Sequence, residues 1–288
     1  MSTGASPASR PLLTQEVHGQ LLAAARNGER TLECSLDLQR SRTSVQLRPD
    51  GWVWQGERFP YLRTCKERTI YYWDGTDFQP AVRFSSSLIK LVPTQWGPPT
   101  FEIDGIKMLP TAHVSPYADA QAKVESVRPR EKVVLDTCGG LGYFAAWCVR
   151  GGAAQIISCE KNPDVIWLRS LNPWSPAEGS GLRLLQADIT QQIHSIADAS
   201  IDAILHDPPR FGIAGELYSG VFYQSLARVL RHKGTLFHYT GSPNKLTSGR
   251  DVRSEVAERL RRAGFAVLPQ GDGVLATRRA PGRHSAPA

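Results

Sequence analysis

The stretch from residue 133 to residue 144, VVLDTCGGLGYF, constrains the fold of this chain more than any other. Its apolar start, Val133–Leu135, is typical of a strand buried in a parallel sheet, and Asp136 ends that strand. Three glycines follow within six residues, before an apolar run that is typical of a helix. A strand, a glycine turn and a helix in this order are the first unit of a nucleotide-binding α/β sheet, in which a ligand approaches the turn and the helix start.

The rest of the second half continues this alternation of strands and helices. Strands are predicted at Val133–Asp136, Gln155–Glu160, Leu182–Asp188, Ile201–His206 and Thr235–Tyr239, with a closing hairpin of Phe265–Leu268 and Gly273–Arg278. Helices are predicted at Phe144–Arg150, Pro163–Leu171, Gly220–Leu230 and Val252–Ala263, and a further helical pattern runs from Ser115 to Pro129. This order predicts an α/β fold with a mostly parallel sheet, helices on both faces and ligands at the carboxyl ends of the strands.

The first part of the chain has another pattern. One short amphipathic helix is expected at Leu12–Arg26, with Thr14 as its N-cap and Gly28 as its stop. From Thr31 onward, apolar and polar residues alternate between Asp-Gly turns, which predicts a small antiparallel β domain. We therefore expect four segments. They are a disordered lead with a short helix at 1–30, a β-rich accessory domain at 31–112, a ligand-binding α/β domain at 113–282 and a disordered tail at 283–288.

Composition limits the partners of the chain. The net charge of +7 permits binding to nucleic acid, and the solvated surface of an arginine-rich protein explains the same charge. The five cysteines are scattered without CxxC spacing, which argues against a disulfide framework and against a zinc site. The sequence shows no secretory pattern and no apolar run long enough for a membrane span, so no membrane partner and a cytoplasmic location are expected.

Acidic residues stand at the ends of four predicted strands and carry the chemical argument. They are Asp136, Glu160, Asp188 and Asp207, and we expect these four carboxylates to face one crevice at the carboxyl ends of the strands. So much negative charge suits a ligand that carries a sulfonium, an ammonium group and a ribose better than it suits a phosphate. We expect Glu160 to accept both ribose hydroxyls, and Asp188 with Ile189 to hold an adenine amine and its ring.

These ordered motifs resemble class I S-adenosylmethionine-dependent methyltransferases over residues 116–279. The resemblance implies a Rossmann-like, seven-stranded sheet, S-adenosylmethionine as the cofactor and no metal ligand. The residues that it implies for cofactor binding are Asp136, Thr137, Gly139, Gly140, Leu141, Gly142, Glu160, Lys161, Asp188, Ile189 and Asp207. Cys138 replaces the first glycine of the usual motif, and we expect it to be a packed small side chain rather than a nucleophile.

The string HDPPRF at 206–211 is similar to the Asp-Pro-Pro motif of the amine-methylating branch of that family. The resemblance implies that the carboxylate and a proline-flanked carbonyl accept hydrogen bonds from the target NH₂ in an in-line SN2 transfer. Arg210 replaces the branch's aromatic residue, with Phe211 after it. The expected catalytic residues are Asp207, Pro208, Pro209, Arg210 and Tyr239, and His206 and His238 are more readily explained as structural histidines.

Several alternatives stay open. The turn CGGLG is similar to that of spermidine synthases, although Leu141 stands where those aminopropyltransferases carry an acidic residue. The chain also resembles a group of predicted methyltransferases that share HDPPRF and AGELY. A non-catalytic RNA- or protein-binding module is the third alternative. The acceptor is expected to be a nitrogen of RNA, with a small amine or a protein as alternatives, and the sequence does not predict an oligomeric state.

The β domain leaves a related question open. Its aromatic and basic residues either stack on bases and neutralise phosphates or form the core of a small sheet. These residues are Trp52, Trp54, Tyr71, Tyr72, Trp73, Arg63, Lys66 and Arg68.

Overall fold

The structure is a computed structural model that describes residues 10–179, 181–241 and 251–280. Residues 1–9 of the expected disordered lead and the expected tail at 283–288 lie outside the described residues. The contacts within the chain divide it into two compact units. One comprises residues 1–119 with 164–175, and the other comprises 120–163 with 176–288.

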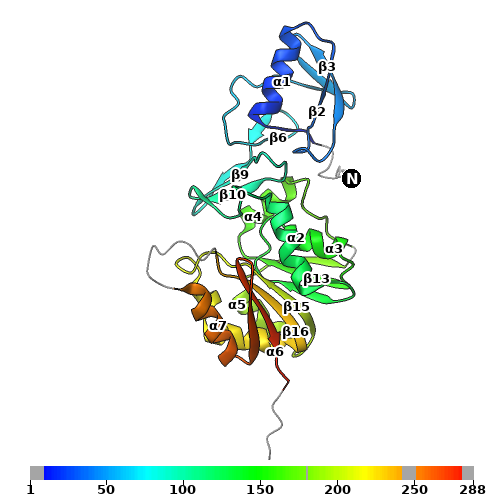
Figure 1. Ribbon diagram of the computed structural model, residues 1–288. Coiled ribbons are helices and arrows are strands. Elements are labelled where there is room, and N and C mark those ends of the chain that lie inside the picture. The colour runs from blue at the N-terminus through cyan, green and yellow to red at the C-terminus, as the bar shows by residue number, and fades with distance from the viewer. Residues whose placement is uncertain (1–9, 180, 242–250, 281–288) are drawn as a thin grey trace, which may run out of the picture. The chain divides into compact units, whose positions relative to one another are not determined.

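The first unit contains helix α1 and three small antiparallel sheets, in agreement with the antiparallel β structure that the alternating pattern predicted (Figure 1). The sheets are β1-β6-β7 (Leu12–Leu13, Tyr71–Trp73, Phe78–Pro80), β2-β3-β4-β5 (Thr31–Cys34, Thr43–Arg48, Gly51–Trp54, Glu57–Phe59) and β11-β10-β9-β8 (Ile106–Lys107, Thr100–Ile103, Leu88–Val92, Val82–Phe84). The helix, α1, spans Gln15–Arg26 and begins with Thr14 as its N-cap, as expected. Leu12 and Leu13, at the start of the predicted helical pattern, lie outside the helix and pair with β6 as a short strand.

Some aromatic residues of the first unit form its core. Trp52 is only 1% exposed and stacks on Phe59 with ring centroids 4.6 Å apart. Tyr71 is also buried, whereas Trp54 and Tyr72 are half-buried. The core explanation therefore holds for Trp52 and Tyr71.

Most of α4, which spans Pro163–Leu171, belongs to the first unit. The Asp164 carboxylate accepts a hydrogen bond from Ser85 Oγ at 2.8 Å. The Arg83 guanidinium lies 3.9 Å from the centre of the Trp167 ring, in a cation–π contact. In the sequence, α4 comes between two strands of the second unit. These contacts nevertheless attach it to the N-terminal β strands of the first unit.

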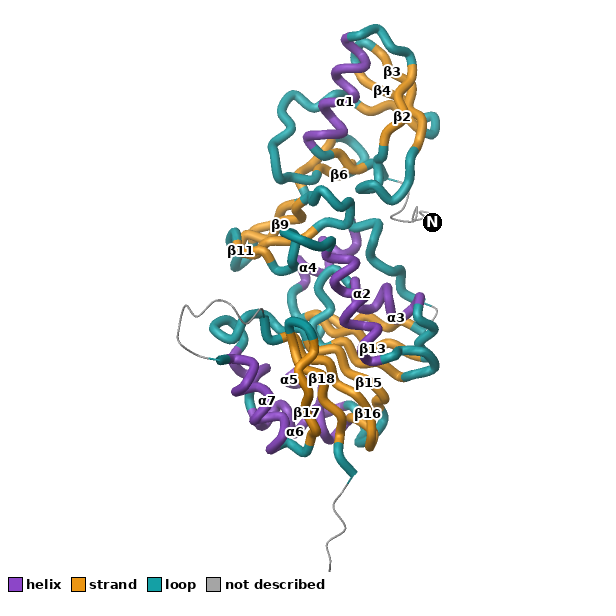
Figure 2. The backbone as a smooth tube through the Cα atoms, viewed as in Figure 1, coloured by secondary structure: helices purple, strands orange, loops and turns teal. Residues whose placement is uncertain are grey.

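The second unit is built on a seven-stranded sheet, which confirms the predicted fold class. Its order is β14-β13-β12-β15-β16-β18-β17, and β18 is antiparallel to both of its neighbours. Figure 2 shows the strands of this sheet in orange. The strands are β12 (Val133–Asp136), β13 (Gln155–Glu160), β14 (Leu182–Gln186), β15 (Ile201–His206), β16 (Leu230–Tyr239), β17 (Phe265–Gln270) and β18 (Gly273–Arg278). The predicted closing hairpin is β17 and β18.

Helices and short turns connect these strands. They are α2 (Pro116–Val127, with its residues from 120 onward in this unit), α3 (Tyr143–Arg150), α5 (Ile189–Gln192), η2 (Ile193–Ser195), η3 (Gly215–Tyr218), α6 (Gly220–Val229) and α7 (Val252–Arg262). Phe222 and Leu226 of α6 and Leu260 of α7 pack in one buried cluster with Ile204 and Leu236 of the sheet. This apolar cluster fixes the strands whose carboxyl ends carry the sequence motifs.

Two strand boundaries differ from the prediction. The strand β14 ends at Gln186 rather than Asp188, because Asp188 accepts a hydrogen bond from Thr190 N as the N-cap of α5. The strand β16 starts at Leu230 rather than Thr235. Its pairing with β15 shifts between Ile201 and Ala203, so the polar segment RHKG extends the strand through an irregularity instead of forming a loop.

Candidate active site

The glycine turn lies at the carboxyl edge of the seven-stranded sheet and is tied to the neighbouring strand. Gly140 and Gly142 have φ angles of 49° and 80°, a left-handed backbone that favours glycine. The N–H of Gly139 donates to the carbonyl of Cys159 at 2.7 Å, and the N–H of Gly140 donates to Glu160 Oε2 at 2.9 Å. The buried Leu141 side chain anchors the turn from below. The structure thus brings the turn and Glu160 together, as expected.

The two acidic residues on the adjacent strands are held in fixed orientations. Glu160 Oε1 accepts a second backbone hydrogen bond, from Asn162 N at 2.9 Å. Asp188 Oδ2 lies 2.7 Å from Lys161 Nζ, and its other oxygen accepts from Thr190. Burial alone would raise the pKa of Asp188, but the hydrogen bonds from Lys161 and Thr190 hold it below its usual value. Glu160, Lys161 and Asp188 therefore form a charged rim beside the turn.

Three predicted cofactor residues lie in the interior instead. Asp136 is 1% exposed and accepts a hydrogen bond from Ser158 Oγ at 2.8 Å, so the expectation that it faces an open crevice was wrong. Thr137 is 2% exposed beneath the turn, and the Ile189 side chain packs in the apolar cluster. Burial raises the pKa of the Cys138 thiol well above its usual value, which agrees with a packed side chain and not with a nucleophile.

The Asp-Pro-Pro loop follows β15. Asp207 has a 20% exposed side chain, Pro208 is buried and Arg210 is exposed. The carbonyl of Pro209 accepts a hydrogen bond from Tyr218 Oη at 3.1 Å. The carbonyl of Pro209 is therefore bonded within the protein.

Two buried histidines support this loop from below. His206 Nδ1 lies 2.7 Å from Thr137 Oγ1 and its Nε2 lies 3.0 Å from the carbonyl of Leu217. His238 Nε2 lies 2.8 Å from Tyr223 Oη, and the two imidazole rings are 4.4 Å apart. Burial lowers the pKa of His206 to about 4 and that of His238 well below its usual value. Both are hydrogen-bonded interior residues, which agrees with the structural alternative.

The sequence reasoning missed Lys123, which lies on α2. Its side chain is 5% exposed, and its Nζ lies 3.6 Å from Asp207 Oδ2 and 3.8 Å from Asp272 Oδ2. The same ammonium lies 4.2 Å from the centre of the Tyr239 ring. Asp207 and Tyr239, both predicted, are thus brought together by a lysine and by the turn between β17 and β18.

One signal would have revealed this lysine. Lys123 is three residues after Ala120 and four before Val127, so it shares the apolar stripe of its helix with two buried residues. Lysine side chains are seldom buried unless a group of opposite charge pairs with them, so a lysine on an apolar stripe indicates a buried ion pair.

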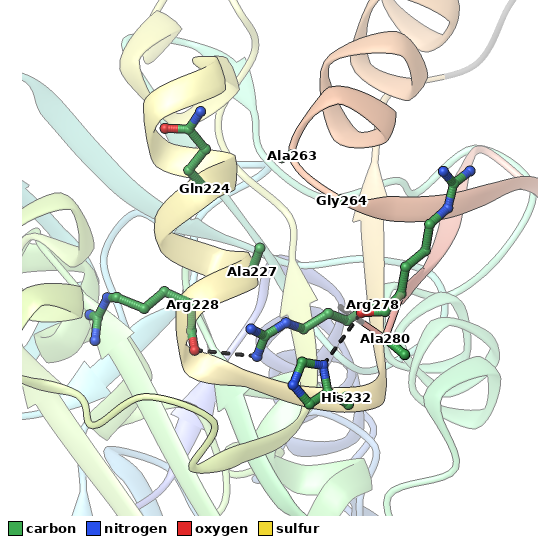
Figure 3. Close-up of a pocket in the computed structure, with 9 residues that line it drawn as sticks. Gln224, Ala227, Arg228, His232, Ala263, Gly264, Arg278 and Ala280 are labelled. Atoms are coloured by element: carbon green, nitrogen blue, oxygen red, sulfur yellow. Dashed lines mark hydrogen bonds between the residues drawn. The ribbon is translucent and has the colours of Figure 1, made fainter. Parts of the chain in front are cut away.

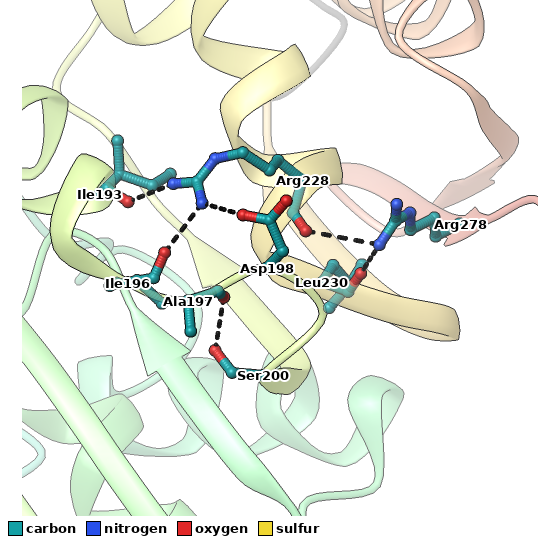
Figure 4. Close-up of polar contacts among 8 residues, drawn as sticks. All are labelled: Ile193, Ile196, Ala197, Asp198, Ser200, Arg228, Leu230 and Arg278. Atoms are coloured by element: carbon teal, nitrogen blue, oxygen red, sulfur yellow. Dashed lines mark hydrogen bonds and ion pairs between the residues drawn. The ribbon is translucent and has the colours of Figure 1, made fainter.

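A hollow of about 530 Å³ lies at the opposite, amino edge of the sheet (Figure 3). Its arginines make structural contacts. The Arg228 guanidinium donates to the carbonyls of Ile193 and Ile196 and pairs with Asp198, while Arg278 donates to the carbonyl of Leu230 (Figure 4). None of the motif residues lines this hollow. We therefore assign its arginines to loop anchoring.

A second hollow, of about 500 Å³, lies within the first unit. Its lining includes Trp54, Tyr72, Trp167 and Arg42. The Tyr72 and Trp167 rings meet edge to face at 5.7 Å, and Trp54 Nε1 donates to Thr43 Oγ1. Aromatic faces beside a guanidinium are the groups that stack on nucleobases.

In the described ranges, no three His, Cys, Asp or Glu side chains are grouped so as to hold a metal ion. The five cysteines are free thiols. No helix among the described residues has both the length and the apolar character that crossing a membrane requires.

Comparison with known proteins relates the chain to one relative and to several solved structures. No family model matches the chain. The protein MJ1233 of Methanocaldococcus jannaschii is 44% identical over 212 residues, which cover 73% of this chain and 72% of the relative.

Two solved structures share the fold of the chain at low sequence identity. A spermidine synthase in complex with the transition-state analogue AdoDATO matches with a TM-score of 0.55 and 17% identity, over 68% of this chain and 72% of that one. MnmC2 from Aquifex aeolicus matches with a TM-score of 0.51 and 21% identity, over 69% of this chain and 72% of that one. At these identities the likeness concerns the fold, which is the Rossmann-like, class I methyltransferase-like fold.

Proposed function

The chain belongs to the same family as MJ1233 of Methanocaldococcus jannaschii, and from this premise we propose that it is an S-adenosylmethionine-dependent methyltransferase. One observation carries the proposal. At the carboxyl edge of the sheet Glu160 lies against the glycine turn, Asp188 follows the neighbouring strand β14, and Asp207 follows β15 on the opposite side of β12. This set of oxygen acceptors around a glycine turn suits a cationic nucleoside.

The donor and acceptor set at this edge fits the proposed cofactor. Glu160 is oriented by two backbone N–H groups at the position from which it would accept the ribose hydroxyls. Asp188 would accept from the adenine amine, and the open backbone at Gly140 allows close approach. When bound, S-adenosylmethionine supplies a methyl group that its sulfonium already activates.

The chain's own residues would then mainly align the acceptor. Asp207 would accept an N–H of the acceptor nitrogen, offset its developing positive charge and hold the proton that the product releases. Buried Pro208 and the Tyr218 hydrogen bond to Pro209 keep this loop in one conformation. Such positioning contributes up to roughly 7–11 kcal/mol to lowering a barrier when geometry is near that of attack.

We propose RNA as the acceptor. The net charge of +7 and the aromatic hollow lined by Trp54, Tyr72 and Trp167 support this choice. A small amine or a protein side chain is the alternative acceptor.

The test is transfer of tritiated methyl groups from S-adenosylmethionine to total RNA and to total protein from cells that lack the protein. Label is expected in the RNA fraction, and its rate of incorporation should fall by about 100-fold in Asp207→Asn but not in Glu258→Gln, an acidic-to-amide control on α7. Label confined to protein would overturn the RNA assignment. Label in neither fraction would contradict methyl transfer to either class.

A further inference from the structure

A buried cation fills the space beside Asp207. The Lys123 ammonium has two carboxylates within 4 Å, those of Asp207 and Asp272, and the face of the Tyr239 ring 4.2 Å away. These groups come from α2, from the loop after β15, from the β17–β18 turn and from the end of β16. They form a cation box, by which we mean Asp207, Asp272 and Tyr239 around one ammonium.

The chemistry of this box is that of an alkylammonium site. Two carboxylates at ion-pair distance supply negative charge, and an aromatic face supplies a cation–π contact. The carboxylate side chains are 20% and 30% exposed, whereas that of Lys123 is 5% exposed. The chain therefore places its own ammonium at the innermost position of the box.

A substrate ammonium would have to displace this lysine. The displaced Lys123 would lose both carboxylates while it remained anchored on a buried helix face, next to Ala120 and Val127. Removing one partner of a buried ion pair is strongly unfavourable, because the other charge is left without compensation.

We propose that Lys123 is a specificity-determining residue that occupies the ammonium position, so that the acceptor presents an uncharged nitrogen of the nucleobase type to Asp207. This inference rests on the proposed function and narrows its substrate class. It disfavours diamines and other acceptors that are cationic at neutral pH. An uncharged N–H does not need to displace Lys123, because it can approach the exposed part of the Asp207 side chain.

The proposal is tested by removing the Lys123 ammonium and measuring whether a small cation binds in its place. Lys123→Ala and wild-type protein are titrated calorimetrically with n-butylammonium chloride at constant chloride concentration. Wild type is expected to show no saturable binding, and Lys123→Ala is expected to bind with a dissociation constant of roughly 1 mM. Lys123→Arg, which keeps the charge, should not bind.

Adding Asp272→Asn to Lys123→Ala should weaken binding by about tenfold. Lys233→Ala, an exposed lysine at the amino edge, is the matched control.

Two results would overturn the proposal. One is failure of folded Lys123→Ala to bind butylammonium. The other is binding of butylammonium by wild type at the affinity of the variant, which would show that a small cation displaces the lysine readily. If Lys123→Ala does not fold, the wild-type titration alone still tests the proposal, because saturable binding of butylammonium by wild type would contradict it. Binding of S-adenosylmethionine is measured separately, so a failure of the box and a failure of the proposed function give different results.

Discussion

Thr137 Oγ1 lies 2.7 Å from His206 Nδ1, and this contact joins the glycine turn after β12 to the end of β15. His206 Nε2 faces the carbonyl of Leu217 at 3.0 Å, so that nitrogen carries the proton. Nδ1 must then accept, and the Thr137 hydroxyl donates to it. Through these two hydrogen bonds the buried imidazole of His206 connects the proposed cofactor turn to the segment that carries Asp207.

Removing this hydroxyl should cost stability. In Thr137→Val, His206 Nδ1 is left as a buried acceptor without its donor, so we expect a loss of about 1–3 kcal/mol in the free energy of unfolding. Thr137→Ser keeps the hydroxyl and should lose less. Urea unfolding monitored by circular dichroism measures both. Equal stability of wild type and Thr137→Val would show that the hydrogen bond contributes nothing.

The buried histidines should make stability depend on pH. Burial lowers the folded-state pKa of His206 to about 4, from an ordinary value of 6.5, and lowers that of His238 further. Below pH 6.5 the unfolded chain binds protons that the folded chain does not, so the free energy of unfolding falls as the pH drops from 6.5 toward 4. For His206 the full loss is about 3 kcal/mol.

Two measurements check this pH dependence. Urea midpoints should decrease steadily below pH 6.5, and the imidazole proton resonances of His206 and His238 should not titrate while the protein is folded near pH 5.5. Titration of either resonance near its ordinary pKa would contradict the burial account.

Replacing the loop carboxylate should impair transfer more than cofactor binding. Asp207→Asn keeps the size of the side chain and removes its negative charge, so we expect kcat to fall by about 100-fold. Affinity for S-adenosylmethionine should change by less than about threefold, because Glu160 and Asp188 are intact. Single-turnover methyl transfer and calorimetry separate the two effects. An unchanged kcat would remove Asp207 from the proposed chemistry.

The aromatic hollow of the first unit should contribute to RNA affinity. Tyr72→Ala removes one lining ring and should weaken binding by about 1–3 kcal/mol if a base stacks there. Arg42→Ala should reduce the slope of log affinity against log salt by about 1. Fluorescence anisotropy with labelled RNA measures both. Trp96→Ala, which removes an aromatic side chain of this unit that does not line the hollow, should have no effect.

Local patterns predicted the large sheet well and the arrangement of its site less well. The bounds of β12, β13 and β15 follow from short apolar runs, because strands buried on both faces have a direct sequence signature. The start of β16 was missed, since Leu230 pairs with Ile201 and the polar residues 231–234 then lie in a register shift before the next pair, Ala203 with Thr235. Lys123 belongs to no motif, and its role depends on two carboxylates far away in the sequence.

Burial also separated residues that share one motif. Asp136 and Glu160 both end parallel strands, yet Asp136 bonds inward to Ser158 whereas Glu160 bonds to the turn. A pattern of strand ends predicts that side chains lie near one edge, and it does not predict which of them face inward.

The central claim is that the carboxyl edge of the second unit binds S-adenosylmethionine, and calorimetric titration with this compound and with its decarboxylated analogue tests it most directly. We expect binding that favours the carboxylated form, a loss of at least about tenfold in Glu160→Gln, and no loss in Glu258→Gln. A preference for the decarboxylated form would assign the chain to aminopropyl transfer. Binding of neither compound would contradict the account and favour a non-catalytic module.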